Sequence, residues 1–344
     1  MDCRMPRLVG TGLLALDLIV QHDDAGQRLT ASGGGTCGNV LAILARLGWD
    51  SSWLGAMGPS APGRILIEEM QRGGVQMHTS PDDAQAPIFA HHINICADGH
   101  ASHWFSDACP VCARRLPRYS RPSDSWLRDQ AHLVQSADVF FVDRLSAGAL
   151  DLARVAHRCG ALVVYEPSST SDTPWMADMI AIADVVKFSS DRASVLRGCT
   201  PANERTLWVE TRGRDGLQWS LSRVGADREV TPAEHNSHAI DACGAGDWFT
   251  SALLFGLAHT QKRPDELTFA QLTALMRQAS GVAAWSCGFL GARGGLYDAP
   301  VHAIFEHLQA NPERAGESAS LLRPVPRVDA AAPCVYAAAH CAYA

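Results

Sequence analysis

An alternation of short apolar runs with longer helical stretches between residues 139 and 211 constrains the fold of this chain most. Such an alternation is typical of a parallel sheet whose strands are joined by crossover helices. The expected strands are 139–142, 162–165, 185–188 and 207–211, and the expected helices are 146–159, 174–182 and 190–198. We therefore predict an α/β fold with an open, doubly wound, mostly parallel sheet and helices on both faces. Ligands of such sheets bind at the carboxyl ends of the strands.

Two further strand patterns precede this region. Residues 7–20 form an apolar run that predicts the first strand, and Asp17 interrupts it. A carboxylate in an apolar strand either faces water at a strand end or edge, or serves a ligand, and the run leaves both open. Residues 86–106 predict a β-hairpin with its turn at 97–99. Three polar side chains of this hairpin either face solvent or reach a substrate: those of Asn94, His91 and His103.

Composition excludes several classes of function. The 344 residues are 47% hydrophobic, which is enough for a large core, and the formal net charge is -7. Without a basic block, nucleic acid is not an expected partner. The first residues lack the apolar segment of a signal peptide, and no apolar run reaches membrane-spanning length. We therefore expect a cytoplasmic protein that does not bind membranes, with its eleven cysteines reduced.

A glycine-rich turn at 241–247 carries the most specific chemistry. Gly244 and Gly246 let the backbone turn sharply just before an apolar helix. The unpaired N–H groups at such a helix start bind anions, phosphate above all. Asp247 lies beside this anion pocket, where a carboxylate can take a proton from an attacking hydroxyl. The simpler alternative is a helix entry with an ordinary capping aspartate.

A second glycine-rich turn, at 32–39, leads into a predicted helix that ends at Gly48. Asn39 stands at the start of this helix. Taken alone, the pattern favours Asn39 as a helix cap; the alternative is a ligand contact.

The Cys-Pro-Val-Cys segment at 109–112 has the shape of a zinc knuckle. Zinc bound by Cys109 and Cys112 would need further ligands from Cys96, His100, His103 or a second chain. The alternative is a surface loop with free thiols. A dithiol redox site is disfavoured because no clear helix follows Cys112.

Both glycine-rich turns resemble signatures of one family, the ribokinase-like (PfkB-type) carbohydrate kinases. Residues 241–247, Asp-Ala-Cys-Gly-Ala-Gly-Asp, resemble its D-T-x-G-A-G-D string, with Ala242 in place of threonine. Residues 34–48 resemble its G-G-x-x-x-N-x-A-x-x-x-A-R-L-G string, with Leu41 in place of alanine. The two signatures lie in the family's order, roughly two hundred residues apart, which argues against a chance match of both. The resemblance covers about residues 7–310.

The resemblance implies an acceptor side for the active site. The resemblance implies that Asp247 is the catalytic base and that the N–H groups of Gly244, Ala245 and Gly246 hold the transferring phosphoryl group, as the matching residues do in this family. A small β lid covers the sugar. The implied acceptor contacts are Asp17, Gly34, Gly35, Asn39 and, from the lid hairpin, Asn94.

The resemblance also implies a nucleotide side. Thr211, Gly213 and Gly216 resemble a T-x-G-x-x-G turn that faces nucleotide phosphates, and Cys287 and Gly288 resemble the adenine-side stretch. Residues 187–192 cover the K-x-N-x-x-E motif, which serves Mg²⁺ and phosphate. Lys187 is kept, but Ser189 replaces asparagine, Arg192 replaces glutamate, and Asp191 offers a carboxylate one position off. Asp241, with residues near 286–292, matches a monovalent cation site.

We therefore predict a ribokinase-like kinase domain at 1–312, with a lid from about 13–32 and 86–125 inserted in it, and a flexible tail at 313–344. The implied function is phosphorylation of a primary hydroxyl of a sugar by ATP with Mg²⁺. The alternatives are a nucleoside kinase or, because of Arg192, a weakened sugar- or nucleotide-binding regulator. A homodimer is expected, since lid hairpins often pair between subunits in this family. The variable lid leaves the identity of the acceptor open.

Overall fold

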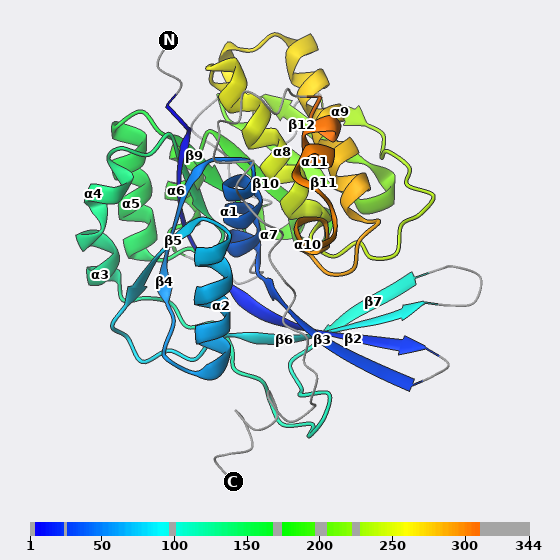
Figure 1. The fold of residues 1–344 in the computed structure, drawn as a ribbon. Helices are drawn as coiled ribbons and strands as arrows, with labels where there is room; N and C mark the ends of the chain where they lie inside the picture. Colours follow the sequence, from blue (N-terminus) through cyan, green and yellow to red (C-terminus); the bar gives the residue numbers. More distant parts are fainter. Residues whose placement is uncertain are drawn as a thin grey trace.

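Two sheets organise the molecule (Figure 1). The computed structural model describes residues 4–23, 26–95, 101–167, 174–196, 205–221 and 228–309. Within these residues one sheet has nine strands and the other has four. The predicted α/β fold is confirmed. The predicted tail at 313–344 lies outside the described residues, and in the described part no helix is both long and apolar enough to cross a membrane.

The nine-stranded sheet is mostly parallel. Its spatial order is β13 (Glu229–Thr231), β12 (Leu217–Leu221), β11 (Leu207–Thr211), β10 (Val185–Ser189), β9 (Leu162–Tyr165), β8 (Val139–Val142), β1 (Arg7–Thr11), β4 (Asp50–Ala56) and β5 (Val75–Ser80). All neighbours from β11 to β5 pair in parallel, and only β12 runs the other way, antiparallel to both β11 and β13. The chain builds outward from β1 to β5, then returns to β8 on the other side of β1. The boundary between β1 and β8 is therefore the topological switch point, beside which such sheets bind ligands.

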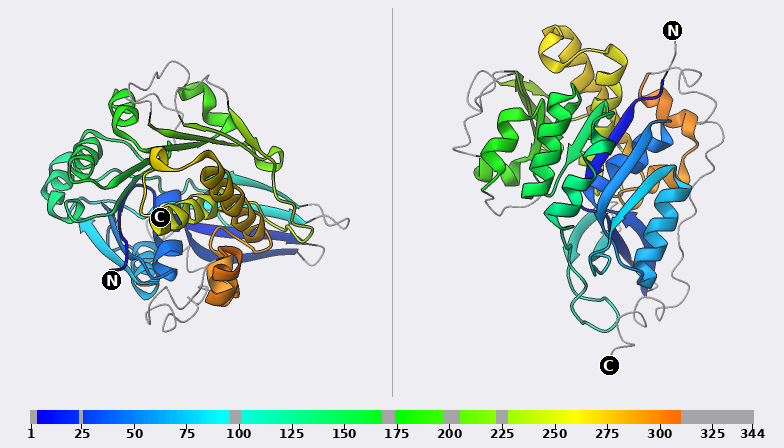
Figure 2. Two further views of the ribbon diagram at one scale, coloured as in Figure 1. Left: turned by 90° about the horizontal axis from the view of Figure 1, so that it is seen from above. Right: turned by 90° about the vertical axis from the view of Figure 1, so that its left-hand side faces the viewer.

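Helices cover both faces of this sheet (Figure 2). One face packs against α1 (Thr36–Arg46), α2 (Ala61–Arg72), α8 (Ala245–Thr260), α9 (Phe269–Ser286), α10 (Gly294–Asp298) and α11 (Val301–His307). The other packs against α3 (Asp124–Asp129), α4 (Ala131–Val134), α5 (Ala147–Arg158), α6 (Met176–Ile182) and α7 (Ala193–Leu196). Every residue of α8 from Asp247 to Leu257 is buried. The apolar run after the glycine-rich turn is thus a core helix, as its lack of a polar face predicts.

The four-stranded sheet, called the small sheet below, projects from the body of the molecule (Figure 1). Its order is β3 (Gly26–Gly34), β2 (Ala15–Asp23), β6 (Ile88–Ile95) and β7 (Ala101–Ser106). The predicted hairpin at 86–106 is present as the antiparallel pair β6 and β7, and its predicted turn at 97–99 lies outside the described residues.

Residues 7–20 do not form one strand, which corrects the sequence-based expectation. The chain leaves the large sheet after Thr11 and enters the small sheet at Ala15. Gly12 has a φ of +152°, and a Cβ there would lie 1.6 Å from Oδ1 of Asp143. The same oxygen accepts the N–H of Leu13 at 2.9 Å, so the end of β8 holds the chain where it turns away. Asp17 consequently belongs to the small sheet.

The predicted helix at 190–198 is also interrupted. Residues Ser190–Arg192 form a 3₁₀ turn, and α7 follows at Ala193–Leu196. Residues 197 and 198 lie outside the described part. The other elements predicted between 139 and 211 are found within two residues of their expected ends.

Candidate active site

A cleft of about 660 Å³ opens at the carboxyl ends of the parallel strands. Both sheets line it: Asp17, Phe89 and Phe105 come from the small sheet, and Lys187 and Thr211 from the large one. The glycine-rich turn and the first residues of α8, 242–247, line it as well. The cleft therefore lies where a doubly wound sheet is expected to hold its ligand.

The start of α8 forms an anion-binding geometry. Gly244 adopts a left-handed conformation with φ of 78°, and a Cβ there would lie 2.6 Å from the Cα of Ala292. Only glycine satisfies both constraints. Among the described residues, no acceptor pairs with the N–H of Gly246. Since the helix dipole also places partial positive charge here, the turn is suited to a phosphoryl oxygen.

Asp247 is buried beside this turn. Its Oδ2 accepts a hydrogen bond from Nδ2 of Asn39 at 2.6 Å. Burial, together with the negative charge of Glu166, raises the pKa of Asp247 to about 7, against the lowering influence of Lys187 and Asn39. A carboxyl group with such a pKa can accept and release a proton near neutral pH.

Asp17, Asn39 and Asp247 line the same cleft, although they come from different elements. Burial raises the pKa of Asp17 to about 7 against the charge of Arg293, and the charge of Asp247 raises it further. Gly34 allows this carboxylate to lie against β3, because a Cβ at Gly34 would be 2.0 Å from Oδ2 of Asp17. The side chains of Asp17, Asn39 and Asp247 thus lie around one cleft, as the resemblance implies.

Sequence reasoning missed a buried network behind Asn39. Arg293 donates from Nε to Oδ1 of Asn39 at 2.8 Å and from Nη1 to Oε1 of Glu69 at 2.8 Å. The hydroxyl of Tyr297 donates to the same Glu69 oxygen at 2.6 Å. Because Arg293 fixes the oxygen of the Asn39 amide, the NH₂ group is the part that faces Asp247. Arg293 follows directly after the Gly291-Ala292 pair, but nothing in the sequence links it to Glu69.

A second buried network lies between the end of β10 and the start of α8, on the side of the cleft predicted to bind the nucleotide. Nζ of Lys187 donates to Oε1 of Glu166 at 2.5 Å and to the carbonyl of Gly246 at 3.0 Å. Thr250, one turn into α8, donates its hydroxyl to Oε2 of Glu166 at 2.9 Å. Lys187 therefore connects β10 with the anion-binding turn and puts a positive charge next to it.

The remaining nucleotide-side candidates line the cleft as a group: Ser189, Asp191, Arg192, Thr211, Gly213 and Gly216. Arg192 also donates from Nη1 to the carbonyl of Pro167 at 3.3 Å. A guanidinium group therefore lines the cleft where the family motif has a carboxylate. Arginine binds phosphate oxygens well but does not coordinate Mg²⁺.

Five candidates for the kinase site are not part of the cleft lining: Gly34, Asn94, Asp241, Cys287 and Gly288. Asn94 is exposed near the far end of β6, opposite Ser102. Cys287 and Gly288 are replaced in the lining by Ser280 and Ala283 of α9. The carbonyl of Cys287 is engaged instead with the N–H groups of residues 240 and 241.

The two cysteines proposed to bind zinc take part in packing. Cys109 is buried in the main core cluster together with Leu116, and Cys112 packs against the same cluster. The carbonyl of Cys109 accepts the N–H of Ala113, which closes a tight turn. Of the expected further ligands, Cys96 and His100 lie outside the described residues, and His103 faces Asp241.

Comparison with known proteins identifies the family. Residues 5–296 match the family model described as pfkB family carbohydrate kinase. The aminoimidazole riboside kinase of Salmonella typhimurium is 26% identical over 239 residues, which is 65% of this chain and 73% of that protein. The fructokinase of Klebsiella pneumoniae is 26% identical over 287 residues, covering 76% of this chain and 88% of the relative.

Solved structures show the same fold. The Arabidopsis thaliana ribokinase complexed with ribose and ATP superposes with a TM-score of 0.61 at 17% identity, covering 90% of this chain and all of that one. Since the family model spans most of the sequence, this chain belongs to the pfkB family of carbohydrate kinases.

Proposed function

We propose that this protein is an ATP-dependent kinase that phosphorylates a primary hydroxyl of a sugar, with Asp247 as the general base. One observation carries the proposal. The buried carboxyl of Asp247, held by Asn39, lies at the N-terminus of α8 in the same cleft as Asp17. A base, an anion-binding turn and an acceptor pocket are the parts that phosphoryl transfer needs.

The acceptor is positioned by Asp17 and Asn39 in this proposal, with Gly34 and Gly35 allowing the sugar close to the backbone. Asp247 takes the proton of the acceptor hydroxyl. The hydroxyl oxygen forms a bond to the γ-phosphorus of ATP, while the bond between the γ-phosphorus and the oxygen that bridges to the β-phosphate breaks, so that ADP leaves. The turn at 244–246 stabilises the charge on the transferring group. The small sheet acts as the lid that excludes water.

The nucleotide is assigned to the side of the cleft formed by Thr211, Gly213, Gly216, Lys187 and Ser189. When bound, ATP supplies the phosphoryl group and Mg²⁺ neutralises its charge. The carboxylates of Glu166 and Asp191 are the hard oxygen donors that Mg²⁺ prefers. In this proposal Arg192 contacts phosphate directly.

Two earlier cation expectations stay predictions. A monovalent cation near Asp241 would bind a carboxylate that is already engaged, because its two oxygens accept hydrogen bonds from the backbone N–H groups of Cys243 and Gly291. Zinc at Cys109 and Cys112 would need ligands beyond the described residues. The homodimer also stays a prediction.

A nucleoside is the second candidate acceptor. Phe89 and Phe105 line the cleft from the small sheet, and aromatic faces suit a flat base. Among the relatives, one is named a fructokinase and another an aminoimidazole riboside kinase, so the names support both classes.

An ADP-release assay over a panel of sugars and nucleosides tests the proposal. We expect turnover with at least one primary alcohol, and loss of turnover in Asp247→Asn with acceptor binding retained in calorimetry. Asp83→Asn, an exposed substitution outside the cleft, serves as the matched control. Tight acceptor binding without turnover in the wild-type protein would instead favour a binding regulator.

A further inference from the structure

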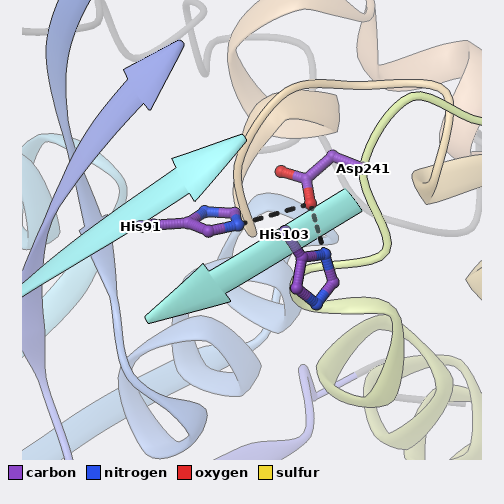
Figure 3. Close-up of side chains that lie close together, drawn as sticks. All are labelled: His91, His103 and Asp241. Atoms are coloured by element: carbon purple, nitrogen blue, oxygen red, sulfur yellow. Dashed lines mark ion pairs between the residues drawn. The ribbon is translucent and has the colours of Figure 1, made fainter. Parts of the chain in front are cut away.

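Three side chains from separate segments meet beside the cleft (Figure 3). His91 comes from β6, His103 from β7, and Asp241 from the loop before α8. Both imidazole rings point at the same oxygen of Asp241. Nε2 of His91 lies 3.6 Å from Oδ1 of Asp241, and Nδ1 of His103 lies 3.4 Å from it. One ligand atom from each residue lies within 4.8 Å of the others.

His91 is the unusual member of this cluster. Its side chain is fully buried, and neither ring nitrogen has a hydrogen-bond partner in the described structure. An uncompensated buried imidazole is unfavourable, which points to a ligand for its nitrogen.

The separations match a shared metal ion better than hydrogen bonds. A hydrogen bond from an imidazole N–H to a carboxylate is shorter, at about 2.7–3.2 Å. Nitrogen and oxygen ligands about 2.0–2.1 Å from a tetrahedral zinc ion lie about 3.3–3.5 Å from one another. The distances of 3.4 and 3.6 Å are close to this value.

We propose that Nε2 of His91, Nδ1 of His103 and Oδ1 of Asp241 bind a divalent transition-metal ion of the zinc class. Two imidazoles and one carboxylate favour zinc and its neighbours over Mg²⁺ or a monovalent cation, which prefer oxygen donors. Three protein ligands leave a position for water, and the side chain of His103 is 34% exposed there.

The surrounding contacts hold the ligands in place. Oδ1 of Asp241 also accepts the N–H of Cys243 at 2.9 Å, and Oδ2 accepts that of Gly291 at 2.8 Å. The ring of His91 stacks on Phe105 with centroids 4.6 Å apart. Such outer contacts orient metal ligands.

The ion would connect the small sheet to the loop that precedes the anion-binding turn. This site is separate from the predicted Cys109 and Cys112 knuckle. It stands on the geometry of the cluster alone and does not depend on kinase activity.

Zinc titration of the full-length protein, stripped of metal with a chelator, tests the site by calorimetry. We expect one tight site whose affinity falls at least about 100-fold in His103→Ala and in His91→Phe. His92→Ala is the matched control, because His92 lies on the opposite face of β6 and should leave binding unchanged. Circular dichroism establishes that each variant is folded.

Two further measurements keep the test decisive. Co²⁺ absorption spectra report imidazole and carboxylate ligation without thiolate bands, and hydrogen exchange should slow in β6, β7 and residues 236–244 of the wild-type protein when zinc is added. Tight binding that survives both histidine substitutions, or that is lost in Cys112→Ala, overturns the proposal. Absence of both tight binding and zinc-dependent protection in the wild-type protein overturns it too.

Discussion

The proposed acceptor side and the proposed nucleotide side of the cleft are built differently. On the acceptor side, Asp247, Asn39, Arg293 and Glu69 form one continuous buried chain of hydrogen bonds. On the nucleotide side, Lys187, Glu166 and Thr250 also form a buried network, but the other candidates lie on strand ends and turns. Arg192 stands there where the family motif has a carboxylate. In the proposed reaction, side-chain identity is therefore more tightly constrained where the proton is transferred than where backbone groups hold phosphates.

Asp247→Asn should have the largest effect on turnover. Removing a general base lowers kcat by about 10²–10⁴-fold. Acceptor and ATP affinities should change little, since asparagine keeps the size of the side chain. Steady-state kinetics with calorimetry measures both, and near wild-type kcat would remove the acceptor side from the chemistry.

Arg293→Met should have the largest effect on stability. It leaves Glu69 buried without its cation, and breaking a buried ion pair in this way destabilises by about 3–5 kcal/mol. Urea unfolding measures the change. Adding Glu69→Gln to the same variant should restore part of the loss. If the free energy of unfolding of Arg293→Met equals that of the wild type, the buried hydrogen-bond network does not distinguish the two sides of the cleft.

The acceptor side should also dominate the pH dependence. Asp247 works as a base only when ionised, so kcat/KM should rise with pH up to about 7 and then level off. A flat profile across this range would contradict the assigned role.

Stability should change in the opposite direction. Asp17 and Asp247 have folded-state pKa values raised from 3.8 to about 7. Their contribution is fully present below the unfolded value and is lost as pH rises through the folded one. The melting temperature of the ligand-free protein should therefore fall between about pH 4 and about pH 7, and less steeply in Asp17→Asn.

Arg192→Ala should have the smallest effect. Arg192 is only partly buried, and a single ion pair of this kind changes affinity by no more than about fivefold. The KM for ATP should rise within this range while kcat stays near the wild-type value. Arg192→Glu restores the family residue and should change the Mg²⁺ dependence. A large loss of kcat in Arg192→Ala would show that the nucleotide side is as exacting as the acceptor side.

The sequence was most informative where function lies in a continuous segment. The turn at 241–247 and the turn at 32–39 each bring a backbone geometry with them, so Asp247 and Asn39 could be assigned before any coordinates. Asp17 was predicted both in a single strand at 7–20 and within a lid at about 13–32. The break at Gly12 could not be predicted, because it depends on Asp143 from a distant strand.

Two other features depended on spatial arrangement. Glu69 and Arg293 are more than two hundred residues apart, and only the packing of α2 against the loop before α10 joins them. Asn94 and His91 cannot share a face of β6, since side chains alternate along a strand and the two differ by three positions. That parity could have removed Asn94 from the candidates.

Helix α8 lacks a solvent-facing side over the eleven residues that begin with Asp247. A rod enclosed by neighbours in every direction cannot swing toward a substrate, so its first turn is a fixed point of the molecule. In the proposed reaction, the motion between the binding of reactants and the release of products is therefore expected in other elements that line the cleft, among them the small sheet.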